Sequence, residues 1–161
     1  MEMELAQIYK MVEQELRIVE SRLIEESQLN LPFVSQGISE LLNGGKRLRP
    51  ALLLISAKGC NYSGQRSINL AIAVELLHTA SLIHEDIVDD AFLRRGRKTI
   101  NSQGGNGISV LAGDHLYSRA MSIFTQDHDF EIMQAIVHAV AQMVRGEITE
   151  WLKQNDTTMS E

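Results

Sequence analysis

Four carboxylates lie within six residues where a long apolar segment ends, at Glu85, Asp86, Asp89 and Asp90. Carboxylates three and four residues apart on a helix repel each other, so a bound cation would explain the cluster. Because no cysteine lies nearby, these oxygen ligands favour a hard divalent ion, Mg²⁺ or Mn²⁺. Salt bridges to neighbouring cations are the alternative, since such pairs are common on protein surfaces.

Basic side chains follow the acids directly, at Arg94, Arg95, Arg97 and Lys98. A Mg²⁺ ion bound by a few carboxylates usually completes its shell with waters and substrate phosphates. Guanidinium groups match phosphate oxygens in geometry and charge. The order of acids and arginines therefore predicts a site for a phosphate-bearing substrate.

A second basic motif, NGGKRLRP, occupies residues 43–50. Its two glycines allow a tight turn. The three cations that follow, Lys46, Arg47 and Arg49, precede the first turn of a helix, which predicts an anion site. A glycine helix cap followed by solvated basic residues is the alternative. His78 lies on the helix face that leads to Glu85, either as a core histidine or as a ligand.

Composition limits the class of protein. The 161 residues suit one all-helical domain, and 44% of them are hydrophobic, enough for a core. The net charge of −6 argues against nonspecific nucleic-acid binding and against an anionic membrane surface. The single cysteine fits a reducing, cytoplasmic setting, and we expect neither a signal peptide nor a transmembrane segment.

Apolar residues recur at helical spacing along the chain, with no segment of strand periodicity. We expect an antiparallel bundle of helices at about 3–28, 33–42, 50–60, 65–91, 108–125 and 128–152, with a glycine-rich basic loop at 94–107. The last residues, NDTTMSE, resemble the start of another helix capped by Thr158 or Ser160, so we expect that the sequence is cut short.

Together these motifs resemble the trans-polyprenyl diphosphate synthases of isoprenoid biosynthesis. The order is GGKRLRP at 44–50, HEDIVDDAFLRRGRKT at 84–99, NSQGGNGISVLAGD at 101–114 and GEI at 146–148. The resemblance covers the whole chain but only about the N-terminal half of a usual member. It implies the helix bundle of the isoprenoid synthase type, ending before the second aspartate-rich motif.

The resemblance also implies residue roles. Isopentenyl diphosphate would be bound by the basic motif, His78 and Arg95, with Lys46 and Arg49 as the closest matches and Arg47 between them. Arg94 would contact the allylic diphosphate, and Glu85, Asp86 and Asp89 would hold Mg²⁺. Asp86 and Arg94 would act in the catalytic step, in which the allylic diphosphate ionises and the isopentenyl double bond attacks. The small side chains of Ala80 and Ser81 would leave room for a medium to long product, and Leu77 is one of the residues that could close the pocket.

The sequence departs from the family pattern at three positions. Glu85 replaces the usual first aspartate, Lys98 a frequent proline and Glu150 a common glutamine. The family also implies a homodimer through the helix at 108–125. Two other functions stay open: a non-catalytic subunit that needs a second chain, and a helical module whose acids and bases pair internally.

Overall fold

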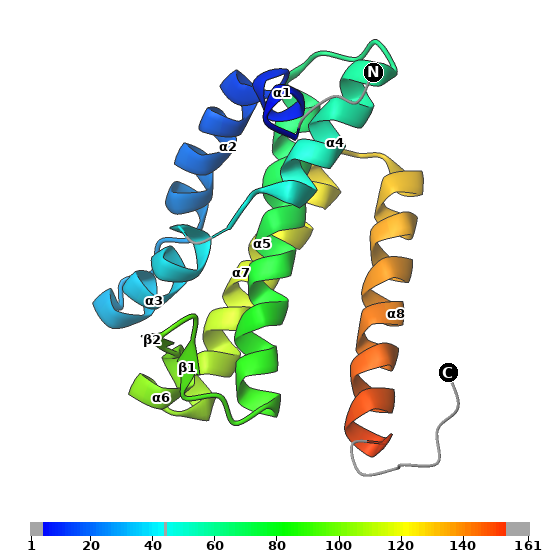
Figure 1. The fold of residues 1–161 in the computed structure, drawn as a ribbon. Helices are drawn as coiled ribbons and strands as arrows, with labels where there is room; N and C mark the ends of the chain where they lie inside the picture. The colour runs from blue at the N-terminus through cyan, green and yellow to red at the C-terminus, as the bar shows by residue number, and fades with distance from the viewer. Residues whose placement is uncertain (1–4, 44, 154–161) are drawn as a thin grey trace. The chain divides into compact units, whose positions relative to one another are not determined.

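The computed structural model describes residues 5–43 and 45–153. These residues confirm the all-α class, and they also form one short pair of antiparallel β-strands (Figure 1). The elements are α1 (Leu5–Lys10), α2 (Glu13–Glu26), α3 (Pro32–Asn43), α4 (Leu48–Gly59), α5 (Gln65–Val88), β1 (Leu93–Arg94), β2 (Arg97–Lys98), α6 (Ile100–Gly104), α7 (Asn106–Gln126) and α8 (Phe130–Lys153). The predicted caps Thr158 and Ser160 lie outside the described residues. The chain divides into two compact units, Met1–Gln126 and Asp127–Glu161, and each is described by itself.

Helix α5 forms the core of the first unit. It packs most extensively against α7, and also against α4 and α2. Its side chains at Ile72, Leu76 and Ile83 are fully buried, and each such side chain contributes about 1.5–3 kcal/mol of burial free energy. By length and composition α5 could cross a membrane, but more than half of its apolar stretch is buried inside the protein. It is therefore the core helix of the bundle.

The predicted helix at 3–28 is interrupted at Met11 and Val12. Helix α1 ends at Lys10, and Val12 has the non-helical backbone angles φ −127° and ψ 16°. The carbonyl oxygen of Met11 accepts a hydrogen bond from Lys58 Nζ at 2.5 Å. This contact with α4 fixes the chain at the break. The apolar periodicity continues through the break, so it could not reveal the interruption.

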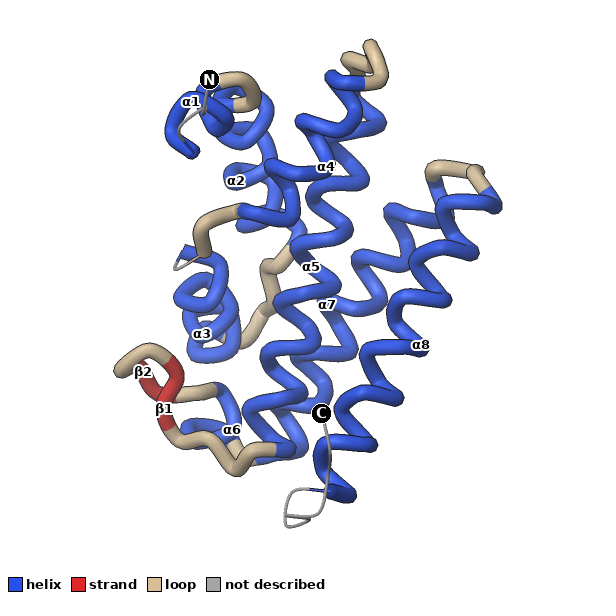
Figure 2. The backbone as a smooth tube through the Cα atoms, turned by 45° about the vertical axis from the view of Figure 1, so that its right-hand side comes forward, coloured by secondary structure: helices blue, strands red, loops and turns tan. Residues whose placement is uncertain are grey.

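The predicted loop at 94–107 contains regular structure. Strands β1 and β2 pair antiparallel, with Arg94 opposite Arg97. The two residues between them, Arg95 and Gly96, both have positive φ, 53° and 79°, as a tight type I′ hairpin turn requires. Glycine adopts this conformation without steric cost. Figure 2 shows this hairpin next to α3 and α6, at the carboxyl end of α5.

The second unit contains α8. Its start is capped by Asp129, whose carboxylate accepts hydrogen bonds from the backbone N–H groups of Glu131 and Ile132 at 3.0 and 3.2 Å. A carboxylate at this position also interacts favourably with the helix dipole. The predicted helix at 128–152 is therefore confirmed, with a start two residues later than expected.

Candidate functional site

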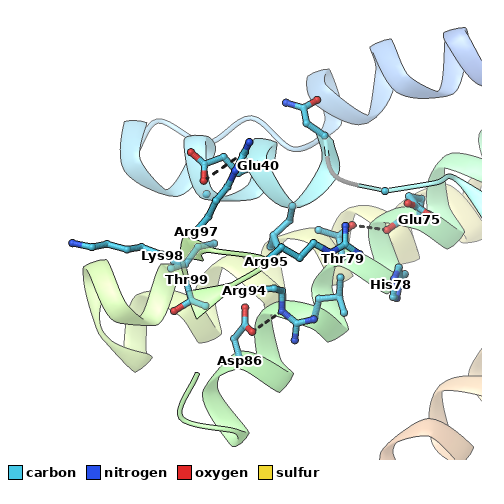
Figure 3. A pocket seen from close by; sticks show the side chains of 16 residues that line it. Glu40, Glu75, His78, Thr79, Asp86, Arg94, Arg95, Arg97, Lys98 and Thr99 are labelled. Carbon is cyan, nitrogen blue, oxygen red and sulfur yellow. Dashed lines mark hydrogen bonds and ion pairs between the residues drawn. The ribbon is translucent and has the colours of Figure 1, made fainter. Parts of the chain in front are cut away.

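A cleft of about 240 Å³ opens between α3, one face of α5 and the β1–β2 hairpin. Pockets for drug-sized ligands measure roughly 300–1,000 Å³, so this cleft suits a smaller polar group. Helix α5 contributes residues at intervals of three and four, which is one helix face: Glu75, His78, Thr79, Leu82 and Asp86. The hairpin contributes the cations of the cleft, Arg94, Arg95, Arg97 and Lys98 (Figure 3).

Two of the predicted metal ligands are held by an arginine of the same cleft. Arg94 Nε donates to Asp86 Oδ1 at 2.7 Å, and Arg94 Nη2 lies 3.5 Å from Glu85 Oε2. The Asp86 side chain is only 5% exposed, whereas that of Glu85 is 32% exposed. A buried carboxylate without a partner is costly, so the ion pair with Arg94 offsets the cost of burying Asp86.

The remaining acids of the motif are exposed to solvent. Asp89 caps the end of α5 and Asp90 follows it, and both are exposed. Among the described residues, no three Asp, Glu, His or Cys side chains are close enough together to hold a metal ion. In this structure Glu85 and Asp86 therefore follow the salt-bridge alternative, while the assignment of Glu85, Asp86 and Asp89 to Mg²⁺ stays a prediction.

His78 is the residue of the candidate site whose pKa is influenced by charges from several elements. Burial lowers the pKa of His78 below its usual range, and the positive charges of Arg49, Arg94 and Arg95 lower it further, whereas Glu85 opposes them. These charges come from α4, from the end of α5 and from the hairpin. Of the predicted substrate-binding residues, His78, Arg94 and Arg95 line the cleft together, whereas Arg49 is not among the residues that line it. At neutral pH the imidazole is uncharged and can donate one N–H to an anion.

The other two cations of the basic motif are placed differently. Lys46 is exposed and lines a groove beside Tyr9 of α1, outside the cleft. The Tyr9 hydroxyl donates to the carbonyl oxygen of Lys46 at 2.6 Å. Arg47 is 8% exposed, and its guanidinium group points into the protein toward Glu75. The positive charge of Arg49, the third of these cations, lowers the pKa of His78.

The residues predicted to set product length do not line the cleft. Ala80 faces the core at 2% exposure. Ser81 and Leu77 are partly buried, and the Ser81 hydroxyl donates to the carbonyl oxygen of His78 at 2.8 Å. Ala80 and Leu77 lie on other faces of α5 than the residues that line the cleft, whereas Ser81, three residues after His78, lies at the edge of that face.

Two residues without a predicted role fix the carboxyl end of α5. Asn101 Nδ2 donates to the carbonyl oxygens of Asp86 and Ala91, at 3.1 Å in both cases. The Thr99 hydroxyl also donates to Ala91 O, at 2.7 Å. These bonds tie the segment after the acids to the start of α6. Local composition gives only a weak signal for them, because Asn and Thr in a glycine-rich segment are also ordinary turn residues.

Comparison with known proteins matches this arrangement to one family. The polyprenyl synthetase family model matches residues 32–161. Octaprenyl diphosphate synthase of Haemophilus influenzae is 34% identical over 160 residues, which cover 99% of this chain and 49% of that protein. Heptaprenyl diphosphate synthase component 2 of Geobacillus stearothermophilus is 34% identical over 149 residues, 92% of this chain and 47% of that protein. The chain thus spans about half the length of these relatives.

Solved structures agree in fold. A decaprenyl diphosphate synthase from Rhodobacter capsulatus has a TM-score of 0.88 and 32% identity, over 96% of this chain and 48% of that one. A polyprenyl synthase from Caulobacter crescentus, complexed with calcium and isoprenyl diphosphate, has a TM-score of 0.90 and 27% identity, over 98% and 48%. The sequence resemblance and the predicted partial isoprenoid synthase bundle are confirmed, and the chain belongs to the polyprenyl synthetase family.

Proposed function

We propose that this chain carries part of the active site of a prenyltransferase that condenses isopentenyl diphosphate with an allylic diphosphate. One observation carries the proposal most directly. Arg94 and Arg95 line one cleft together with the half-buried His78, and Arg49 of a separate element adds positive charge that lowers the pKa of this histidine. Such a concentration of guanidinium groups around a neutral imidazole suits a diphosphate, which accepts several charge-assisted hydrogen bonds at once.

The proposed roles divide the cations between two substrates. Lys46, Arg49, Arg95 and His78 bind isopentenyl diphosphate, and Arg94 binds the allylic diphosphate. Arg94 and Asp86 act in the catalytic step, because a guanidinium held at this place stabilises the charge that develops on the departing diphosphate. The apolar interior around α5 keeps water away from the carbocation.

The donor chemistry of the acidic motif fits a divalent cation. Glu85, Asp86 and Asp89 offer only carboxylate oxygens, the ligands that Mg²⁺ and Mn²⁺ prefer, and the Arg94 pairing of Glu85 and Asp86 shows that a positive charge is accommodated there. We propose that these three residues hold Mg²⁺ together with the substrate. When bound, Mg²⁺ supplies positive charge that stabilises the leaving diphosphate.

The complete enzyme is proposed to make a medium to long product. The relatives named above make octaprenyl, heptaprenyl and decaprenyl diphosphates. The small side chains of Ala80 and Ser81 would leave room for the growing chain, and Leu77, one turn earlier, is a candidate to close the pocket. We expect Ala80→Phe in the complete enzyme to shorten the product. An unchanged product length on chromatography would assign the end of the pocket to other residues.

The proposal extends to where the protein is located in the cell and how it assembles. We propose a cytoplasmic homodimer that pairs through α7. Several side chains of α7 are exposed and apolar in the single chain, Val110, Leu111 and Tyr117 among them, and a homodimer interface would cover them.

A second candidate function is a binding subunit that acts with another chain. The name of the Geobacillus relative, component 2, describes that protein as one component of a synthase. The two functions differ in turnover. We expect the 161-residue chain, verified by intact mass, to bind isopentenyl diphosphate and to show little elongation of labelled substrate, because one acidic motif supplies metal ligands from one side only. Absence of isopentenyl diphosphate binding would contradict both functions.

A further inference from the structure

The second cation of the basic motif, Arg47, is oriented opposite to its neighbours. Lys46 and Arg49 on either side of it are exposed, whereas Arg47 is 8% exposed. Its Nη1 donates to Glu75 Oε1 at 3.0 Å, and its Nη2 donates to the carbonyl oxygen of Leu42 at the end of α3. One guanidinium therefore connects the segment before α4 with two other helices, α3 and α5.

The backbone of Arg47 is held in an unfavourable conformation. Its φ of 51° lies in the left-handed region, where a side chain with a Cβ atom is crowded. Arg47 is also the N-cap of α4, yet its side chain makes no capping hydrogen bond. The contacts of the guanidinium group are what compensate this conformation, and they determine where α4 begins. Arg49 lies in the first turn of that helix, so its position depends on them.

Gly45 provides the space for this arrangement. A Cβ atom at position 45 would lie 2.6 Å from Arg47 Nη1 and 3.5 Å from Glu75 Oε1. The first distance is shorter than van der Waals contact allows, so any larger residue displaces the guanidinium group. The close approach of Arg47 therefore favours glycine at this position.

The contact between Arg47 and Glu75 also has an electrostatic role. It lines the cleft, and it is 6% exposed. An unpaired carboxylate there would repel an anionic substrate and would be costly to bury. Arg47 neutralises it. Glu20 adds little, because its Oε1 is 3.6 Å from Arg47 Nε and its side chain is 53% exposed.

We propose that Gly45, Arg47 and Glu75 form a positioning unit that fixes Arg49 and Lys46 for isopentenyl diphosphate, and that Arg47 does not itself contact the substrate. The inference rests on the proposed function, since it concerns the same binding site. It replaces the direct role predicted for Arg47 from sequence with an indirect one. The reason is that the described partners of its guanidinium group are Glu75, Glu20 and Leu42 O.

Two variants separate positioning from charge. Gly45→Ala changes no charge and displaces only the guanidinium group. Arg47→Lys keeps the charge but cannot donate to Glu75 and Leu42 O through one planar fork. We expect each to weaken isopentenyl diphosphate binding about five- to tenfold in calorimetric titration, because small displacements of binding groups have large effects. Gly59→Ala is the matched control, since a Cβ atom there meets nothing within 4 Å, and it should bind like the parent.

The other outcomes identify which claim fails. Unchanged binding by both variants, with Lys46→Ala weakened, would refute the positioning unit and leave the proposed function intact. If Arg47→Lys alone binds like the parent, Arg47 acts only through its charge, and positioning by its planar guanidinium group is refuted. Suppose the variants have a lower melting temperature but an unchanged dissociation constant, measured at a temperature where all of them are folded. Gly45, Arg47 and Glu75 would then form a purely structural contact, and the positioning role would be refuted. A parent chain that binds no isopentenyl diphosphate would refute the proposed function and this inference together.

Discussion

The two ends of the candidate site differ in how completely they are assembled in the free protein. At the basic motif, Arg47 is buried and hydrogen-bonded to two helices. At the acidic motif, Asp89 and Asp90 are exposed, and Glu85 and Asp86 are paired with Arg94. At the first end the buried cation is already paired with its partners, whereas at the second end Arg94 lies where a metal ion is proposed.

This difference has a simple electrostatic origin. A site built from cations stays assembled without ligand when buried acids next to it, such as Glu75, balance the positive charge. A cluster of carboxylates repels itself unless a cation lies among them, and in the free chain the available cation is Arg94. Binding at the acidic end should therefore require Mg²⁺, whereas binding at the basic end should not.

The largest effect should come from removing Arg94. Arg94→Met leaves Asp86 buried without its partner, and we expect the free energy of unfolding to fall by about 2–3 kcal/mol. Arg17→Met is the matched control, because Arg17 pairs with Glu13 on the surface with 76% of its side chain exposed. That surface pair should be worth less than about 1 kcal/mol. Urea unfolding measures both, and equal losses would contradict a special role of the Arg94–Asp86 pair.

The next largest effect concerns the basic end. Lys46→Ala and Arg49→Ala should each weaken isopentenyl diphosphate binding about tenfold or more, since a charge-assisted contact contributes roughly 1.5–3 kcal/mol. The circular dichroism spectrum should not change, because both side chains are exposed. Lys10→Ala, also an exposed lysine, is the control. If both variants bind like the parent, the glycine-rich segment is only a helix cap.

A smaller effect is expected at the departure from the family pattern. Glu85→Asp shortens the carboxylate arm at the acidic end, and Mg²⁺ demands near-ideal geometry. We expect Mg²⁺-dependent binding of an allylic diphosphate to strengthen about threefold. Titration with and without Mg²⁺ separates this effect from a change in the apo protein. Weaker binding would mean that the site is adapted to glutamate.

The smallest effect should be the pH dependence that His78 contributes. Because the pKa of His78 is lowered in the folded chain, the unfolded chain binds more protons below the ordinary value of 6.5. Stability should therefore fall as the pH drops from 7 toward 5. His78→Gln should flatten this decline. His115, whose pKa burial also lowers, should retain a separate part of the slope, and an unchanged slope in His78→Gln would refute the assignment.

The helices were largely predictable from the sequence, because apolar spacing reports which face is buried. Helices α3, α4 and α5 lie close to the predicted ranges. The interruption at Met11 was not predictable, since the apolar spacing continues through it and the contact made there, with Lys58, joins residues 47 apart in sequence. The hairpin was missed for another reason. Two-residue strands are too short for a period-two pattern, and only the Arg95-Gly96 dipeptide indicates the turn.

The site was predictable in its residue types but not in its orientations. The sequence identified Arg47 as one of three similar cations, and no local pattern distinguishes the buried one. Its partner Glu75 lies 28 residues away, and the choice between ligand and structural contact depends on which helices meet there. The same holds for Arg94, which the sequence assigned to substrate and which the free chain uses to neutralise Asp86.

The central claim is that the acidic end binds its substrate through a divalent cation. Calorimetric titration of the chain with farnesyl diphosphate, in excess Mg²⁺ and again in EDTA, tests it most directly. We expect at least about tenfold tighter binding with Mg²⁺, while isopentenyl diphosphate should bind with similar affinity in both conditions. Equal affinity for farnesyl diphosphate in Mg²⁺ and in EDTA would contradict the metal-bridging role of Glu85, Asp86 and Asp89.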